Sequence, residues 1–368
     1  MVKIYDLPCG DEVHRFDYNI VIPFKGKRRV LSTAPYNGGY RTDLKTVFNH
    51  DCNPGVGCSA EMKGKTYREH MMRTMEEIGL DPETAAGLET AASMDNAAIC
   101  TERFEKLAVT AIVTGGIEVN AGRVGDPATW IEDSAVAPEY RPGTINILLC
   151  INGDLSQGAM ARALVTCTEA KTAAIQELMA ESRSSRGLAT GSGTDGTIVA
   201  ADMESEMYLT DAGKHSKLGE LIGRAVKPAV KRALYLQTKL DAGRQHNVIR
   251  RLSRFGVSEA GLYRRYVREQ GALAVDRARF SELLEEQAVK GGLVAKASFI
   301  AHAIDQMDWG LLSVGETTEA ASEILMQMGM EEPLPDSGAG TPDETVELIV
   351  EAFEKVFLKK VLKVPMNP

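Results

Sequence analysis

The sequence predicts an α+β protein, with a mixed β-sheet layered against long α-helices and an all-helical C-terminal extension. Residues 143–152 alternate apolar side chains with small or polar ones, which is the period of a strand. Residues 157–181 are rich in alanine and lack proline, and Ser156 before them is a good N-cap, as expected for a long helix. Because strands and helices alternate along the core, a doubly wound α/β arrangement is the alternative.

The other elements follow from the same periodicities and from glycine and proline signals. Strands are expected at residues 3–6, 12–21, 28–34, 107–114 and 197–202, and helices at residues 67–78, 82–94 and 217–240. The helix at residues 82–94 is predicted from its alanine content.

The chain is expected to divide into a core and a helical extension. The core covers residues 1–243, and the extension covers residues 244–332, whose arginines alternate with apolar residues as on the solvated face of amphipathic helices. Residues 333–340 form a Pro/Gly/Ser linker, and residues 341–368 hold a last helix that opens with a capping box.

Composition limits the partners and the compartment. A formal charge of −9 over 368 residues argues against general nucleic-acid binding. No apolar run reaches the length of a membrane span, and the first residues lack the apolar centre of a secretion signal, so a cytoplasmic protein is expected. The sequence leaves the oligomeric state open.

The cysteines and histidines predict no metal centre. The six cysteines show no regular framework and are expected to be reduced. His50, Cys52 and Cys58 are potential ligands, but their spacing matches no familiar zinc motif.

Lys171 is the unusual residue of the long helix. It falls in the same row as Leu164 and Leu178, whereas Glu169 falls in the opposite row, which is expected to face solvent. An ammonium on an apolar stripe must reach outward, pair with a carboxylate or lose its proton. Lys171 is therefore either structural or catalytic, and Thr168, one turn back, is expected to share its pocket wall.

The glycine-rich loop after this helix contains Gly191, Gly193 and Gly196 in the spacing G-x-G-x-x-G. A dinucleotide site needs strand, glycines and helix in that order, and here the helix comes first, so this reading is rejected. The loop offers backbone amides beside the Thr194 hydroxyl and the Asp195 carboxylate, which are parts of an oxyanion hole or a ligand cradle. A plain turn is the alternative.

Other polar residues stand where chemistry is often placed. Asn120 and Asp126 follow a strand that opens into glycines, and Asn37 lies in a turn that is either structural or a pocket lip. Asn146 lies inside a strand and makes either a structural hydrogen bond or a ligand contact. His215 precedes a helix, where the dipole favours its neutral form, as a general base requires.

Several blocks closely resemble the CbiZ family, the adenosylcobinamide amidohydrolases of corrinoid salvage. They occur in the family's order and are TGGIEVNAGRVGDPATW (114–130), GTINI (143–147), TEAKTAA (168–174), TGSGTD (190–195) and AGKHSKLGE (212–220). The segment STAPYNGGY (32–40) also looks like that family. The resemblance covers roughly residues 30–240 and does not cover the C-terminal third.

The resemblance implies hydrolysis of the amide that joins aminopropanol to the corrinoid ring, giving adenosylcobyric acid. The corrinoid is then the small-molecule partner, and no cofactor is expected beyond the cobalt that the substrate carries. Amide hydrolysis needs a nucleophile or activated water, donors for the oxyanion and an acid for the leaving amine.

The expected roles follow from these needs. The candidate catalytic residues are His215 or Asp195 as base, Lys171 or the loop amides as oxyanion support, and Thr194 or Thr168 as covalent nucleophile. The candidate substrate-binding residues are Asn37, Asn120, Asp126, Asn146, Thr168, Glu169, Gly191 and Gly193. The alternatives are a non-catalytic corrinoid carrier or regulator, and an N-terminal-nucleophile enzyme that uses Thr168 after self-cleavage.

Overall fold

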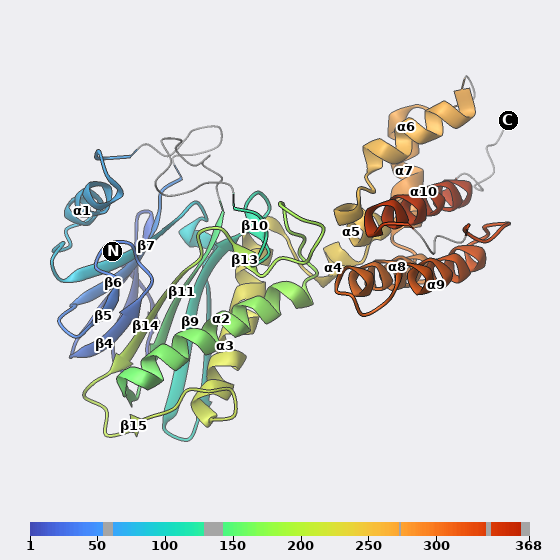
Figure 1. The fold of residues 1–368 in the computed structure, drawn as a ribbon. Coiled ribbons are helices and arrows are strands. Elements are labelled where there is room, and N and C mark those ends of the chain that lie inside the picture. Colours follow the sequence, from blue (N-terminus) through green and yellow to red (C-terminus); the bar gives the residue numbers. More distant parts are fainter. Residues whose placement is uncertain (54–61, 129–142, 272–273, 336–339, 362–368) are drawn as a thin grey trace. The chain divides into compact units, whose positions relative to one another are not determined.

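The computed structural model describes residues 1–53, 62–128, 143–271, 274–335 and 340–361. Its internal contacts divide the chain into two compact units, Met1–Asp241 and Ala242–Pro368 (Figure 1). Each unit has its own buried apolar core, so each is described by itself.

The first unit is built on β-sheets that pack face to face. The first sheet has the order β1 (Val2–Asp6), β2 (Glu12–Phe16), β3 (Asn19–Pro23), β6 (Thr46–Asp51) and β7 (Ala85–Thr90). The second has the order β5 (Gly39–Arg41), β4 (Arg28–Ser32), β14 (Gly196–Asp202), β11 (Thr144–Ile151), β9 (Leu107–Gly116) and β8 (Ala98–Phe104). Both sheets are mixed, since β6 is parallel to β7 and β11 is parallel to β14 while their other neighbours are antiparallel.

Helices cover the outer faces of these sheets (Figure 1). The long helices α2 (Gln157–Glu177) and α3 (Lys217–Thr238) pack on the second sheet, and α1 (Tyr67–Glu77) packs on the first. The layers are therefore helix, sheet, sheet and helix pair. This arrangement confirms the α+β prediction, with two mixed sheets in place of a single one.

The central strand β11 shows why its sequence alternates. Ile145 and Ile147 point into the core beneath α2 and α3, whereas Leu148 points into the layer between the sheets. Every residue of β11 is buried because the second sheet is covered on both faces. The predicted N-cap of α2 is confirmed, since the Ser156 hydroxyl accepts a hydrogen bond from the Ala159 amide.

Two sequence-based elements are wrong. The single strand expected at residues 12–21 is the hairpin β2–β3, whose turn contains Asp17 with a φ of 46°. The helix expected at residues 82–94 is strand β7 followed by a short 3₁₀ turn, Met94–Asn96. Pairing with β6 and burial between layers outweigh the helical preference of alanine there.

Short strand pairs close the loops of the first unit. They are β10 (Ala121–Gly122) with β13 (Gly191–Ser192), and β12 (Asp154–Leu155) with β15 (Tyr208–Leu209). The β10–β13 pair joins the loop after β9 to the glycine-rich loop before β14.

The second unit is helical throughout its described part. Its helices are α4 (Ala242–Gln245), α5 (Val248–Leu252), α6 (Glu259–Gln270), α7 (Arg277–Ala288), α8 (Gly291–Asp308), α9 (Val314–Gln327) and α10 (Pro342–Val361). Phe353 and Phe357 of α10 lie in the same core as Tyr266 and Phe280, so α10 packs as part of this unit. Among the described residues, none of the helices is both long and apolar enough to cross a membrane.

Candidate active site

Several of the predicted residues meet at one edge of the second sheet, where β9 ends and where β11 and β14 begin. We call this the edge site and define it by Asn120, Lys171, Thr194 and Asp195 around the peptide bond between Gly143 and Thr144. The β10–β13 ladder and a hydrogen bond from the Gly193 amide to the Asn120 carbonyl (3.2 Å) hold its two loops together. Residues from four separate blocks of sequence thus converge here.

The Gly143 carbonyl oxygen lies at the centre of the edge site. It accepts hydrogen bonds from Asn120 Nδ2 at 2.8 Å and from Thr194 Oγ1 at 3.0 Å. The Thr144 hydroxyl donates to the Thr194 carbonyl at 2.7 Å. Thr194 therefore contacts both the carbonyl of Gly143 and the hydroxyl of the next residue.

Lys171 and Asp195 hold the strand and the loop of the edge site in place. Their side chains form an ion pair and are only 11% and 13% exposed. Asp195 also accepts hydrogen bonds from the Ile145 amide (2.9 Å), the Ser192 hydroxyl (2.6 Å) and the Ser192 amide (3.1 Å). A carboxylate has about four acceptor sites, and these donors occupy them, so Asp195 positions β11 and the loop and has no acceptor site left for a substrate proton.

Gly191 is required by the same ion pair. A Cβ atom at this position would lie 2.2 Å from Asp195 Oδ2 and 2.7 Å from Lys171 Nζ. At Gly193 a Cβ would lie 3.1 Å from Asn120 Oδ1. The glycines of the loop thus make room for polar side chains, which is a packing role compatible with the predicted cradle.

Asn146 lies one layer deeper, between the two sheets. Its Nδ2 donates to Asn49 Oδ1 (2.8 Å) and to the Glu89 carbonyl (2.9 Å), and Asn49 Nδ2 donates to the Thr114 hydroxyl (2.8 Å). The amide donors of Asn146 are therefore used inside the fold. This contact is the structural hydrogen bond that was one of its two expected roles.

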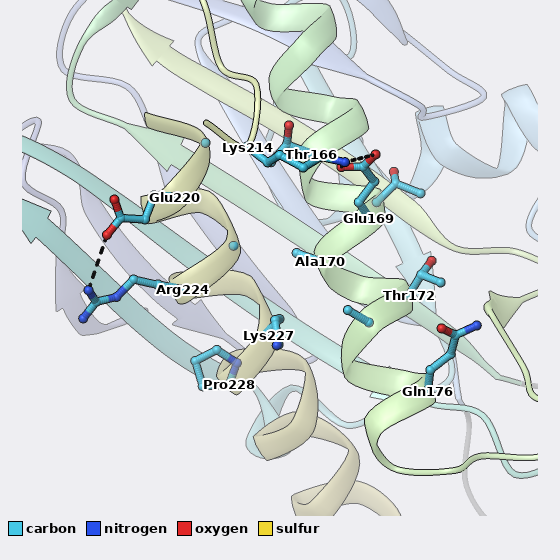
Figure 2. A pocket seen from close by; sticks show the side chains of 14 residues that line it. Thr166, Glu169, Ala170, Thr172, Gln176, Lys214, Glu220, Arg224, Lys227 and Pro228 are labelled. Atoms are coloured by element: carbon cyan, nitrogen blue, oxygen red, sulfur yellow. Dashed lines mark hydrogen bonds and ion pairs between the residues drawn. The ribbon is translucent and has the colours of Figure 1, made fainter. Parts of the chain in front are cut away.

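Thr168 and Glu169 lie on the other side of α2 from the edge site. Thr168 is exposed and donates to the Leu164 carbonyl (3.0 Å), and Glu169 pairs with Lys214 (2.9 Å). Both line a groove of about 850 Å³ between α2 and α3, where Figure 2 shows Glu169 facing Lys214. The expected shared wall of Thr168 and Lys171 is not found, because Lys171 is buried against the sheet.

His215 is exposed in the loop before α3. Two residues further on, Lys217 lies over the Phe104 ring at 4.6 Å, at the end of the β8–β9 hairpin remote from Gly116. β9 has 10 residues, which at the rise of a strand is about 30 Å. The structure therefore does not bring His215 to the edge site.

Asn37 and Asp126 make hydrogen bonds that stabilise the loops in which they lie. Asn37 Nδ2 donates to the carbonyls of Pro82 (2.6 Å) and Ala85 (2.7 Å), which ties the β4–β5 turn to the start of β7. Asp126 accepts from the Ser182 hydroxyl at 2.6 Å. Partial burial favours the neutral form of Asp126, but the hydrogen bonds of its serine neighbours outweigh this and lower its pKa.

Gly143 and Thr144, the two residues at the centre of the edge site, were not predicted from the sequence. Both stand in the GTINI block, where the threonine was assigned to a strand face. A glycine directly before a hydroxyl residue at the start of a core strand is the signal that would have identified them.

The described residues offer no group of three or more His, Cys, Asp or Glu side chains placed to hold a metal ion. Cys58, one of the potential ligands, lies outside the described residues. Among the described residues, Cys9, Cys100, Cys150 and Cys167 are free thiols, and the Cys52 thiol donates a hydrogen bond to the Thr90 carbonyl (3.2 Å).

Comparisons with known proteins give a family match that falls almost entirely in the first unit. The sequence model of the CbiZ family, described as adenosylcobinamide amidohydrolase, matches residues 5–242. An uncharacterized protein of Methanocaldococcus jannaschii, MJ1613, is 39% identical over 252 residues, which is 65% of this chain and 95% of that protein. A crystal structure of the PH0078 protein from Pyrococcus horikoshii OT3 covers 63% of this chain and 80% of its own, with 13% identity and a TM-score of 0.30.

Proposed function

The chain belongs to the CbiZ family of adenosylcobinamide amidohydrolases, and we propose that it hydrolyses the amide between aminopropanol and the corrinoid ring of adenosylcobinamide. The products are adenosylcobyric acid and aminopropanol, and the reaction belongs to corrinoid salvage. Water is the co-substrate, and the cobalt arrives with the corrinoid.

The observation that supports this function is the pair of donors at the edge site. Oxyanion-hole donors act at about 2.7–3.1 Å from the developing negative charge, and Asn120 Nδ2 and Thr194 Oγ1 lie at 2.8 Å and 3.0 Å from a carbonyl oxygen. A substrate carbonyl bound at the position of the Gly143 oxygen would have the same donors to stabilise its tetrahedral intermediate. The Thr144 hydroxyl beside them is the nearby nucleophile.

Lys171 and Asp195 act in this proposal through the backbone. Asp195 holds the Ile145 amide and the Ser192 amide at fixed positions, and Lys171 neutralises its charge in a partly buried setting. They are positioning residues, and the oxyanion donors Asn120 and Thr194 are the catalytic ones.

The test is release of aminopropanol from adenosylcobinamide by the full chain, measured by mass spectrometry together with adenosylcobyric acid. Asn120→Ala and Thr194→Val should each lower turnover about a hundredfold. Thr110→Ala is the matched control, since Thr110 is a buried threonine of β9 whose hydroxyl pairs with Thr101 (2.7 Å). Tight binding of adenosylcobinamide without release would support a corrinoid carrier and refute the enzyme.

A further inference from the structure

We propose that the peptide bond between Gly143 and Thr144 cleaves itself, and that Thr144 then serves as an N-terminal nucleophile. The cleavage stands on the geometry of the uncut chain, whereas the use of Thr144 on a corrinoid amide rests on the proposed function. Thr168, the residue that the sequence offered for self-cleavage, lies on an exposed helix face and donates to the Leu164 carbonyl (3.0 Å).

The bond between Gly143 and Thr144 lies among side-chain hydrogen-bond donors. A backbone carbonyl at the start of a strand usually bonds to another backbone amide, but that of Gly143 accepts from the side chains of Asn120 and Thr194. These donors polarise the carbonyl and are placed to stabilise an oxyanion on it. The bond that precedes Thr144 is thus activated for attack.

The nucleophile is the Thr144 hydroxyl. The Oγ of a threonine can reach the preceding carbonyl carbon through a five-membered ring, so no other element has to move. Thr144 is 3% exposed, and its hydroxyl donates a hydrogen bond to the Thr194 carbonyl (2.7 Å). This hydrogen bond restricts the rotation of the hydroxyl, which lowers the entropic cost of bringing it to the neighbouring carbonyl.

The backbone conformation also constrains the bond. Gly143 has a φ of +133°, and a Cβ there would lie 2.8 Å from the Gly116 carbonyl oxygen. Only glycine adopts such a φ without strain. On its other side, the Ile145 amide is fixed by Asp195 at 2.9 Å. Both sides of the bond are therefore constrained by residues of the edge site.

The reaction balances with one water molecule. Thr144 Oγ adds to the Gly143 carbonyl carbon, the C–N bond breaks, and the hydroxyl proton passes to the nitrogen, which leaves an ester and a free amine. Water then adds to the ester carbonyl and the C–O bond breaks. The products are the Gly143 carboxylate and a Thr144 that carries a free hydroxyl and a free α-amino group.

The new terminus would be ready for amide hydrolysis. An N-terminal threonine is activated by its own amine, which takes the hydroxyl proton and returns it to the leaving group. Asn120 and Thr194 are then free to serve the substrate carbonyl. The two fragments would stay together, because β11 and β14 of the second fragment pair with β9 and β4 of the first.

The experiment follows the purified full chain by denaturing gel, intact mass and N-terminal sequencing. Self-cleavage predicts fragments 1–143 and 144–368, the second beginning Thr-Ile-Asn-Ile. Thr144→Ala should remain uncut, Thr144→Ser should be cut, and Asn120→Ala should be cut about a hundredfold more slowly. Thr110→Ala should be cut as the wild type is.

The assay of aminopropanol release on the same samples separates the two proposals. Cut protein without release supports the cleavage and refutes the amidohydrolase. The cleavage proposal is overturned if the wild-type chain releases aminopropanol while it stays a single polypeptide and Thr144→Ala releases it at the wild-type rate. The proposed function would then remain. A cut at any other bond would also overturn it.

Discussion

Lys171 of α2 and Asp195, the residue before β14, form a largely buried ion pair that joins a helix to the start of a strand 24 residues away in sequence. Removing one partner of such a pair leaves the other charge uncompensated. Lys171→Met should therefore lower the free energy of unfolding by about 3 kcal/mol, measured by urea denaturation.

The matched control is Lys214→Met, which breaks the exposed pair with Glu169 and should cost less than about 1 kcal/mol. The double variant Lys171→Met with Asp195→Asn should recover part of the loss. Equal costs for Lys171→Met and Lys214→Met would contradict the importance of the buried pair.

Gly191→Ala should disturb the same pair by steric contact. Its Cβ would lie 2.2 Å from Asp195 Oδ2, so the carboxylate must move away from the Ile145 and Ser192 amides. We expect turnover to fall at least tenfold, of the order seen when a reacting group is misplaced. Its cross-strand partner gives the control: a Cβ at Gly122 would meet no atom of the described residues within 4 Å, and the turnover of Gly122→Ala should change little.

His50 makes the stability of the fold depend on pH. Burial, and to a smaller extent the nearby charge of Lys63, lowers its pKa from 6.5 to about 4. Between pH 6.5 and about pH 4, His50 therefore binds a proton in the unfolded chain but not in the folded chain. The contribution of His50 to the free energy of unfolding is complete above pH 6.5 and is lost as the pH falls toward 4. The loss is at most about 3 kcal/mol.

Urea denaturation at a series of pH values checks this. His50→Gln should flatten the fall in this pH range, whereas replacement of the exposed His215 by glutamine should leave it as in the wild type. An unchanged slope in His50→Gln would show that another group causes the acid sensitivity.

His215→Ala tests the placement of the sequence-predicted base. Because His215 lies at the far end of the β8–β9 hairpin from Gly116, its loss should change the rate of aminopropanol release less than about tenfold, below the usual contribution of a general base. A hundredfold loss in a folded variant would return His215 to the catalytic residues.

The sequence predicted what depends on local patterns. The strand at β11, the helices α2 and α3 and the inward direction of Lys171 are each set by periodicity within one segment. The helix predicted at residues 82–94 was wrong because pairing with β6, a non-local contact, decides their conformation.

The candidate site shows the same limit. Asn120, Thr194 and Asp195 were named from loops that open from strands and glycines, yet their partner, the Gly143 carbonyl, was not. Strand order decides which backbone atom the three loops enclose, here the Gly143 carbonyl oxygen. Periodicity does not encode strand order.

The contact of Asn49 with Asn146 and Thr114 has a consequence for how the sheets stack. Apolar contacts are non-directional and specify the relative position of two packed sheets less strongly than hydrogen bonds do. A shift of one sheet would leave the buried amides of Asn49 and Asn146 and the Thr114 hydroxyl without these hydrogen-bond partners. Each lost partner would cost about 1–3 kcal/mol. These hydrogen bonds therefore favour a single relative position of the first and second sheets.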